Sequence, residues 1–297
     1  MKKLIKHLAF KFAQIWILIP RRWGRGFFSL LGYFWFDILR LRRRLILENI
    51  AVAFPQMSHT DQLQLGRTCL IRNTGQISDL ISVPAMSRHW IEQNVLFSGI
   101  EHLQAALAEG KGVYLLGSHL GSPDLIINAL QLTGFPIHLI SKKFKSKVLN
   151  DFWFMMRGSQ GVQFIEAHSD RTGFDILRAI RQKEIVIFVL DQHMGRPYGV
   201  KTLFFGKEAG TAYGLALFAI KTKSPVVPIC AFETEDGRLH IEFEQKLDLQ
   251  GKISENKDET IKGLTQLFTD QIEKMVRRHP KEWIWMHRRW KNTADLE

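Results

Sequence analysis

The stretch GVYLLGSHLGSPDLIINALQL, residues 112–132, contains the transition that decides the fold. Gly112–Gly117 is a continuous apolar run, which is typical of a buried strand. Ser122 can cap a helix and Pro123 suits its first position, so we predict a helix over Pro123–Leu132. A strand followed directly by a helix indicates an α/β fold, in which ligands bind beyond the carboxyl ends of the strands.

The same alternation continues along the chain on both sides of this stretch. Apolar runs predict the strands Pro136–Ile140, Val162–Ile165, Ile185–Leu190, Pro225–Phe232 and Arg238–Glu244. Residues 41–110 are predicted to be helical, including Arg44–Ala53 and Thr60–Val83, the second capped by Ser58; later helices are Thr172–Gln182, Thr211–Lys221 and Asp258–His279. The predicted fold class is α/β, with a mostly parallel or mixed central sheet flanked by helices.

The charge of the chain is concentrated at its N-terminal end. The 297 residues carry a net charge of +12, and residues 1–50 hold eleven Lys or Arg against two acids, a net of +9. The remaining residues are near balance, whereas a nucleic-acid enzyme usually spreads basic surface around its site. The pattern therefore predicts attraction to anionic membrane lipids and no nucleic-acid partner.

Apolar runs accompany these charges over residues 4–39. Leu4–Pro20 and Phe27–Leu39 are mostly apolar, but neither reaches the roughly 20 uninterrupted residues of a clean membrane span. Lys11 and the absence of a small-residue cleavage site disfavour a secretory signal. We interpret residues 1–40 as a helical anchor that lies in the membrane interface or dips into the bilayer, on the cytoplasmic side, and 41–297 as the catalytic domain. The alternative is an ordinary buried helical hairpin.

His119 and Asp124 form the clearest candidate for chemistry. His119 falls just past the predicted strand and Asp124 in the first turn of the next helix, so the carboxylate can hold one ring nitrogen while the other takes a proton from a substrate hydroxyl. Gly117 and Gly121 leave room for a bulky substrate, and Gly121 and Ser122 are predicted to line its site. Spacing alone does not separate this pair from a chance His and Asp. No protein nucleophile stands nearby, so direct attack by the substrate hydroxyl is favoured.

Two further features lie at the same predicted edge of the sheet. Asp191 ends the strand Ile185–Leu190, where it could orient Arg157, bind the acceptor or simply cap a turn. The basic run Lys142, Lys143, Lys145 and Lys147 follows the strand Pro136–Ile140. It could be a solvated loop or a docking surface for an acidic partner. Cys69 and Cys230 lie far apart in apolar segments, as expected of buried thiols in a reducing compartment.

Four blocks of sequence, in order, resemble the bacterial lipid A late acyltransferases, within the glycerolipid acyltransferase superfamily. They are Arg44–Pro55, the His119-x-x-x-x-Asp124 box, the Asp191–Gly195 block with Phe204-Phe205-Gly206 and Ala209-Gly210-Thr211, and His279–Lys291. The sequence departs from that pattern at His193, where many members carry Asp, and at Asp124, where well-known members carry Glu.

This resemblance implies an enzyme of the inner membrane that moves a fatty acyl group from acyl carrier protein to a hydroxyl of a membrane lipid, a lipid A precursor first of all. It implies that His119 is the base, Asp124 its partner and Arg157 a substrate-binding residue, and that the lysine run docks acyl carrier protein. No metal or other cofactor is expected. The groups that stabilise the thioester oxyanion are not identified, and Arg157 is one candidate. Alternatives are an aminolipid or glycolipid acceptor, or a non-catalytic peripheral lipid-binding protein.

Overall fold

The computed structural model describes residues 2–296, so Met1 and Glu297, the outer ends of the two predicted domains, lie outside it. The side chains of Lys2, Lys3 and Leu4, which belong to the predicted anchor, and of Asp295 lie outside it as well.

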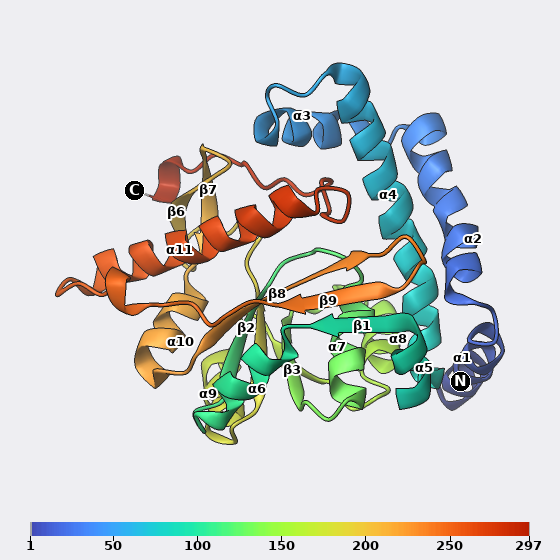
Figure 1. Ribbon diagram of the computed structural model, residues 1–297, viewed down its shortest axis with the longest axis horizontal. Helices are drawn as coiled ribbons and strands as arrows, with labels where there is room; N and C mark the ends of the chain where they lie inside the picture. The colour runs from blue at the N-terminus through green and yellow to red at the C-terminus, as the bar shows by residue number, and fades with distance from the viewer. Residues whose placement is uncertain (1, 297) are drawn as a thin grey trace.

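A seven-stranded sheet forms the centre of the molecule, in the order β1-β9-β8-β2-β5-β3-β4 (Figure 1). Its strands are β1 (Val95–Ser98), β2 (Val113–Gly117), β3 (Ile137–Ser141), β4 (Gln163–Glu166), β5 (Ile185–Val189), β8 (Val226–Glu233) and β9 (Leu239–Phe243). All neighbours are parallel except β8 and β9. The predicted mostly parallel sheet is therefore confirmed.

Helices cover both faces of this sheet. They are α3 (Arg43–Ala53), α4 (His59–Ser82), α5 (Arg88–Asn94), α6 (Ile100–Ala108), α7 (Pro123–Leu132), α8 (Lys147–Arg157), α9 (Thr172–Arg181), α10 (Gly214–Thr222) and α11 (Lys257–Arg278). Tyr114 and Leu116 of β2 point into a core shared with α9, α10 and α11. Val113 and Leu115 point into a second core shared with α5, α6 and α7. Because successive side chains of a strand point to opposite faces of the sheet, this one apolar strand contributes to both cores.

The sequence interpretation is wrong in two places. The first is strand β1, which lies within residues 41–110, a region expected to be all helical. A strand of only four residues is too short to show a recognisable alternation of apolar and polar positions. A separate hairpin, β6 (Gly199–Phe204) and β7 (Lys207–Ala212), was not predicted. Its second strand includes Thr211, so α10 begins at Gly214 and not at Thr211.

The N-terminal segment is helical, as predicted. It comprises α1 (Lys2–Trp16), α2 (Arg21–Tyr33) and a π-helical turn (Phe34–Leu39), and α2 lies along α4 (Figure 1). Its exposed apolar side chains are Ile5, Leu8, Phe12, Ile15, Leu18, Ile19, Trp23, Phe27, Leu30, Leu31, Tyr33, Phe34, Ile38 and Leu39. Within residues 2–296 no helix is both long enough and apolar enough to cross a bilayer.

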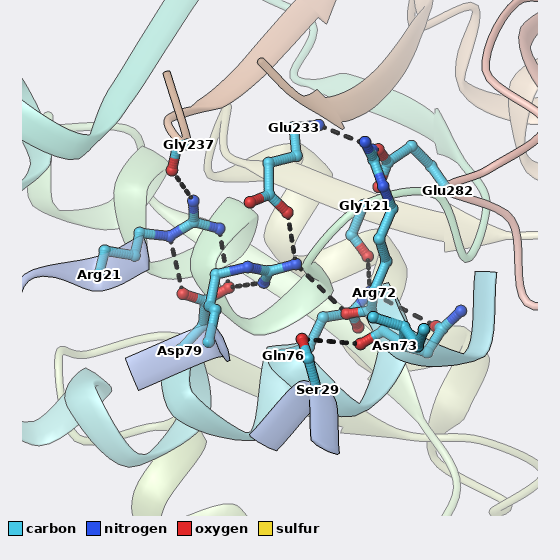
Figure 2. Close-up of polar contacts among 12 residues, drawn as sticks. Arg21, Ser29, Arg72, Asn73, Gln76, Asp79, Gly121, Glu233, Gly237 and Glu282 are labelled. Atoms are coloured by element: carbon cyan, nitrogen blue, oxygen red, sulfur yellow. Dashed lines mark hydrogen bonds and ion pairs between the residues drawn. The ribbon is translucent and has the colours of Figure 1, made fainter. Parts of the chain in front are cut away.

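The opposite face of α2 is tied to α4 and β8 by buried charge. Arg21 donates to both carboxylate oxygens of Asp79 on α4, at 2.8 and 3.0 Å (Figure 2). Arg25 donates to Asp79 at 2.6 Å and to Glu233 at the end of β8 at 2.7 Å. Burial would raise the pKa of Asp79, but the charges of Arg21 and Arg25 outweigh it and hold that pKa below its usual range. Residues 21–25 are therefore an integral part of the fold.

Candidate active site

His119 and Asp191 meet at the carboxyl edge of the sheet. Gly117 of β2 is paired in register with Val189 of β5, and each strand ends two residues before one member of the pair. The Nδ1 atom of His119 lies 2.8 Å from Oδ1 of Asp191, and the backbone N–H of His119 donates to Oδ2 at 3.0 Å. The register of two parallel strands thus brings imidazole and carboxylate together.

The C-terminal segment completes this arrangement. The indole Nε1 of Trp283 donates to Oδ2 of Asp191 at 2.6 Å, and both side chains are wholly buried. Trp283 also forms a backbone bridge with Leu120, and the N–H of Ile284 donates to the carbonyl of His119 at 3.3 Å. Each oxygen of the Asp191 carboxylate therefore has a fixed partner.

These contacts determine the protonation of the pair. Burial opposes the charge of Asp191, but the charge of His119 and the hydrogen bonds from its ring and backbone hold the pKa of Asp191 far below its usual range. Burial and Arg157 lower the pKa of His119, yet the adjacent Asp191 charge prevails and the net shift is upward. An ionised Asp191 keeps the proton on Nδ1 of neutral His119, so Nε2 carries the lone pair that a general base needs.

Asp124 does not contact the imidazole in the structure. It forms an ion pair with Arg157, whose guanidinium lies 5.5 Å from the Trp153 ring and 5.3 Å from the Phe164 ring. Asn128 of α7 donates to the backbone carbonyl of Arg157 at 3.1 Å and fixes the end of α8. The expectation that Asp124 orients His119 is wrong, because the neighbouring strand supplies Asp191 at that position.

The partner suggested for Asp191 is wrong for the same reason. Asp191 binds His119, and Asp124 orients Arg157, so the two carboxylates have exchanged the predicted partners. A direct role in the reaction for Asp124 stays a prediction.

Two residues that the sequence interpretation missed, Gln192 and His287, lie beside the imidazole of His119. The side-chain amide nitrogen of Gln192 lies 3.3 Å from Nε2 of His119 and 3.2 Å from Nε2 of His287. Burial, together with the charge of His119, lowers the pKa of His287 to about 4. Both residues stand inside blocks that carry the family resemblance, and Gln192 directly follows Asp191, which was the available signal.

Gly121 and Ser122 offer no side chain to a ligand. Gly121 has φ +70°, and a Cβ there would lie 2.8 Å from the carbonyl oxygen of Ala231. Its own carbonyl accepts a 2.6 Å hydrogen bond from Gln76 of α4 (Figure 2). Ser122 is at the N-cap position of α7, as predicted, but is buried and makes no capping bond. The space expected for substrate beside Gly121 is filled by strand β8.

The basic loop does follow β3 at the carboxyl edge of the sheet. Lys142, Lys143, Lys145 and Lys147 are all exposed, and Lys143 forms an ion pair with Glu166. Exposed Phe144 stands among them, and exposed Val148 and Leu149 follow in the first turn of α8. The loop thus combines positive charge with apolar surface near the end of the sheet that holds His119.

One group of metal-binding residue types lies elsewhere. Ligand atoms of Cys230, Glu242 and His279 lie within 4.8 Å of one another, where β8 and β9 meet the end of α11. The guanidinium of Arg278 contacts Glu242 at 3.4 Å and the Cys230 sulfur at 3.9 Å, so a cation would have to displace it. Both cysteines are buried free thiols, as predicted.

The fold and the site place a carboxylate-oriented histidine at the carboxyl edge of a mostly parallel sheet. Residues 1–292 match the family described as bacterial lipid A biosynthesis acyltransferase, and the chain belongs to this family. It is 23% identical to the lipid A biosynthesis acyltransferase of Haemophilus influenzae over 251 residues, which are 84% of this chain and 76% of that protein.

Two other relatives carry different names. One is the lipid A biosynthesis lauroyltransferase of Escherichia coli, 21% identical over 89% of this chain and 84% of that protein. The other is a phosphatidylinositol mannoside acyltransferase of Mycobacterium tuberculosis, 24% identical over 73% of this chain and 67% of that protein. The protein is therefore an acyltransferase of this family, which includes relatives named for different lipids.

Proposed function

We propose that this enzyme transfers a fatty acyl group from acyl carrier protein to a hydroxyl of a membrane lipid, with a lipid A precursor as acceptor. One observation carries the proposal: Asp191 holds Nδ1 of His119, so that Nε2 is left as a base at the carboxyl edge of the sheet. The matched family and two relatives named for lipid A biosynthesis support the acceptor.

The reaction needs no protein nucleophile. Nε2 of His119 takes the proton of the lipid hydroxyl while its oxygen attacks the thioester carbonyl carbon. The tetrahedral intermediate then collapses, the carbon–sulfur bond breaks, and the departing thiolate recovers the proton from Nε2. Asp191 stabilises the imidazolium between the two steps, and such base catalysis is worth ~10²–10⁴-fold in rate. No metal or cofactor is part of this scheme.

The N-terminal helices fit attachment to the cytoplasmic face of the inner membrane. α1 and α2 expose a large set of apolar side chains, and the same segment carries Lys6, Lys11 and Arg22 in exposed positions. An amphipathic helix of this kind lies in the interface without spanning the bilayer. Such placement would bring the lipid acceptor to the enzyme without extraction from the membrane.

The exposed loop Lys142–Lys147 supports acyl carrier protein as the donor. Acidic carrier proteins are steered by opposite charge, and this loop offers four cations beside three exposed apolar side chains. A coenzyme A thioester would supply the same reacting bond without an acidic protein surface.

A glycolipid is the second candidate acceptor. The observation that favours it is the similarity to a protein named phosphatidylinositol mannoside acyltransferase. Both candidates present a hydroxyl near the membrane surface, and the chemistry at His119 would be the same.

The purified full-length enzyme should be given acyl carrier protein or coenzyme A thioesters with vesicles containing either acceptor, and products identified by mass spectrometry. We expect transfer from acyl carrier protein to the lipid A precursor, and none above background for His119→Ala. Transfer to the glycolipid alone would show that the acceptor is a glycolipid and not a lipid A precursor. A folded His119→Ala variant that retained more than about a tenth of the rate would contradict the mechanism, because the base should contribute ~10²-fold or more.

A further inference from the structure

Gln192 occupies an unusual position, because its side chain bridges two imidazole nitrogens. Its amide nitrogen is within hydrogen-bond distance of Nε2 of His119 and Nε2 of His287, at 3.3 and 3.2 Å. Nδ1 of His119 carries its proton toward Asp191, so Nε2 is an acceptor and the Gln192 amide must be the donor. One NH₂ group therefore donates two hydrogens, one to the base and one to His287.

The contact with the base has to end when substrate binds. A hydroxyl can surrender its proton to His119 only from hydrogen-bond distance of Nε2, which is the place that the Gln192 hydrogen now fills. That hydrogen then needs another acceptor close by. In the tetrahedral intermediate the oxyanion is attached to the same carbon as the attacking oxygen, so a strong acceptor forms beside the vacated position during the reaction.

We infer that Gln192 is the oxyanion-stabilising residue of this acyltransferase and that His287 positions it. This inference rests on the proposed function. In the reaction the hydroxyl proton moves to Nε2 of His119, the new carbon–oxygen bond forms, and the carbonyl π pair becomes the oxyanion that one Gln192 N–H meets. When the oxyanion collapses, the carbon–sulfur bond breaks and the thiolate takes the proton back from Nε2.

The surroundings of Gln192 suit this role. Its side chain is exposed, while its backbone carbonyl accepts a 3.0 Å hydrogen bond from buried Arg289 and the preceding Asp191 is buried. His287 stays neutral near pH 7 because burial and His119 lower its pKa, so its Nε2 keeps accepting the second amide hydrogen. A preorganised amide donor of this kind needs little rearrangement when charge develops.

Arg157, the other candidate for this role, is already engaged. Its side chain is buried, paired with Asp124, and placed within cation–π distance of Trp153 and Phe164. To reach an oxyanion it would have to leave that carboxylate. The side-chain amide of Gln192 instead contacts the two imidazoles of His119 and His287, neither of which is an anion.

Two variants of Gln192 test the inference. Gln192→Glu is nearly isosteric but replaces both N–H donors with a carboxylate, and Gln192→Ala removes the side chain. Both should lower kcat by ~10²-fold or more, as loss of one oxyanion donor does, while KM for donor and acceptor changes by less than about threefold. Gln182→Glu, at an exposed position after α9, is the matched control for the charge change and should behave like the wild type.

A thioether analogue of the donor separates catalysis from binding. It lacks the carbonyl, so both Gln192 variants should bind it as tightly as the wild type. His287→Gln, which still offers a carbonyl acceptor to the Gln192 amide, should retain more activity than His287→Leu. Thermal melting confirms that each variant is folded.

The outcomes are distinguishable. If Gln192→Glu and Gln192→Ala both keep kcat within about fivefold of the wild type, the oxyanion role is overturned. A parallel loss of thioether binding would overturn it too, since Gln192 would then serve substrate binding. An inactive wild type with every donor and acceptor would overturn the proposed function itself, and this inference with it.

Discussion

Trp283 donates its indole N–H to Oδ2 of Asp191 at 2.6 Å, so a residue 92 positions further along the chain fixes the carboxylate that orients His119. Hydrogen bonds to charged groups contribute about 1.5–3 kcal/mol. The C-terminal segment thus helps to build the candidate active site, although Trp283 is buried and cannot touch substrate.

Trp283→Phe should therefore lower kcat by about tenfold, because Asp191 loses one of its donors and holds the imidazole less firmly. Trp285→Phe is the matched control. Trp285 is equally buried, but its indole donates to the carbonyl of Pro280 at 2.8 Å. Both variants should melt at lower temperature, since each loses buried ring volume. Equal kcat values for the two variants would show that the hydrogen bond from Trp283 does not help to position Asp191.

Asp191→Asn should be the most damaging carboxylate variant. An amide can hold the wrong tautomer of His119, so kcat should fall by ~10²–10⁴-fold. The pKa of His119 also determines how the activity changes with pH. Asp191 raises the pKa of His119 above 6.5, and only neutral His119 is a base, so kcat/KM of the wild type should rise with pH through that raised pKa. In Asp191→Asn the raising charge is gone, and any residual activity should rise at lower pH.

Asp124→Asn should behave differently, because Asp124 holds Arg157 and not the base. We expect a higher KM for one of the substrates, a smaller loss of kcat and an acidic limb of the pH profile that stays close to that of the wild type. Stopped or coupled assays between about pH 5 and 9 span the pKa range of the histidine. A loss of kcat and a shift of the limb as large as in Asp191→Asn would return Asp124 to the role first predicted for it.

The sequence predicts the central strands β2 and β5 well because they are short, apolar and mostly buried. It also places His119 and Asp191 at the same edge, since each follows a predicted strand. It does not say that β2 and β5 are neighbours, and without that register Asp124, only five residues from His119, looks like the natural partner.

The residues that sequence reasoning missed depend on distant contacts. His287 reaches the base only because the segment after α11 returns to pair with Leu120, a contact that no local periodicity encodes. The β6–β7 hairpin was missed because Gly199–Ala212 has weak alternation and several glycines. The local sequence pattern thus predicts most helices and strands. The site itself depends on the order of the strands in the sheet and on the C-terminal segment packing back against Leu120.

The basic loop gives a prediction about the donor. Reversing Lys142, Lys145 and Lys147 to Glu, while keeping Lys143 because it pairs with Glu166, should raise KM for acyl carrier protein strongly and leave kcat nearly unchanged. With a coenzyme A thioester the same variant should change much less. The comparison is sharpest at low ionic strength, where surface charge is least screened. Equal losses with both donors would mean that the loop shapes the site or binds the acceptor.

The N-terminal helices give a prediction about membrane attachment, but deleting them is a poor test. Removal of residues 1–39 would take away Arg21 and Arg25 and leave Asp79 as an unpaired buried charge. Breaking a buried pair in this way costs about 3–5 kcal/mol, so the truncated protein would fail for reasons unrelated to lipid.

Substitution of Trp23, Phe27 and Leu30 by Ser avoids this problem, because all three are exposed on α2 while its arginines stay in place. A fully buried apolar side chain is worth about 1.5–3 kcal/mol, so affinity for anionic vesicles should fall at least about tenfold. A second variant changes Lys6, Lys11 and Arg22 to Gln. It should lose the electrostatic part of vesicle binding, which is the part that added salt weakens. Ile253→Ser, an exposed apolar position outside this segment, should bind vesicles like the wild type. Unchanged sedimentation of both N-terminal variants with vesicles would place the attachment elsewhere on the protein.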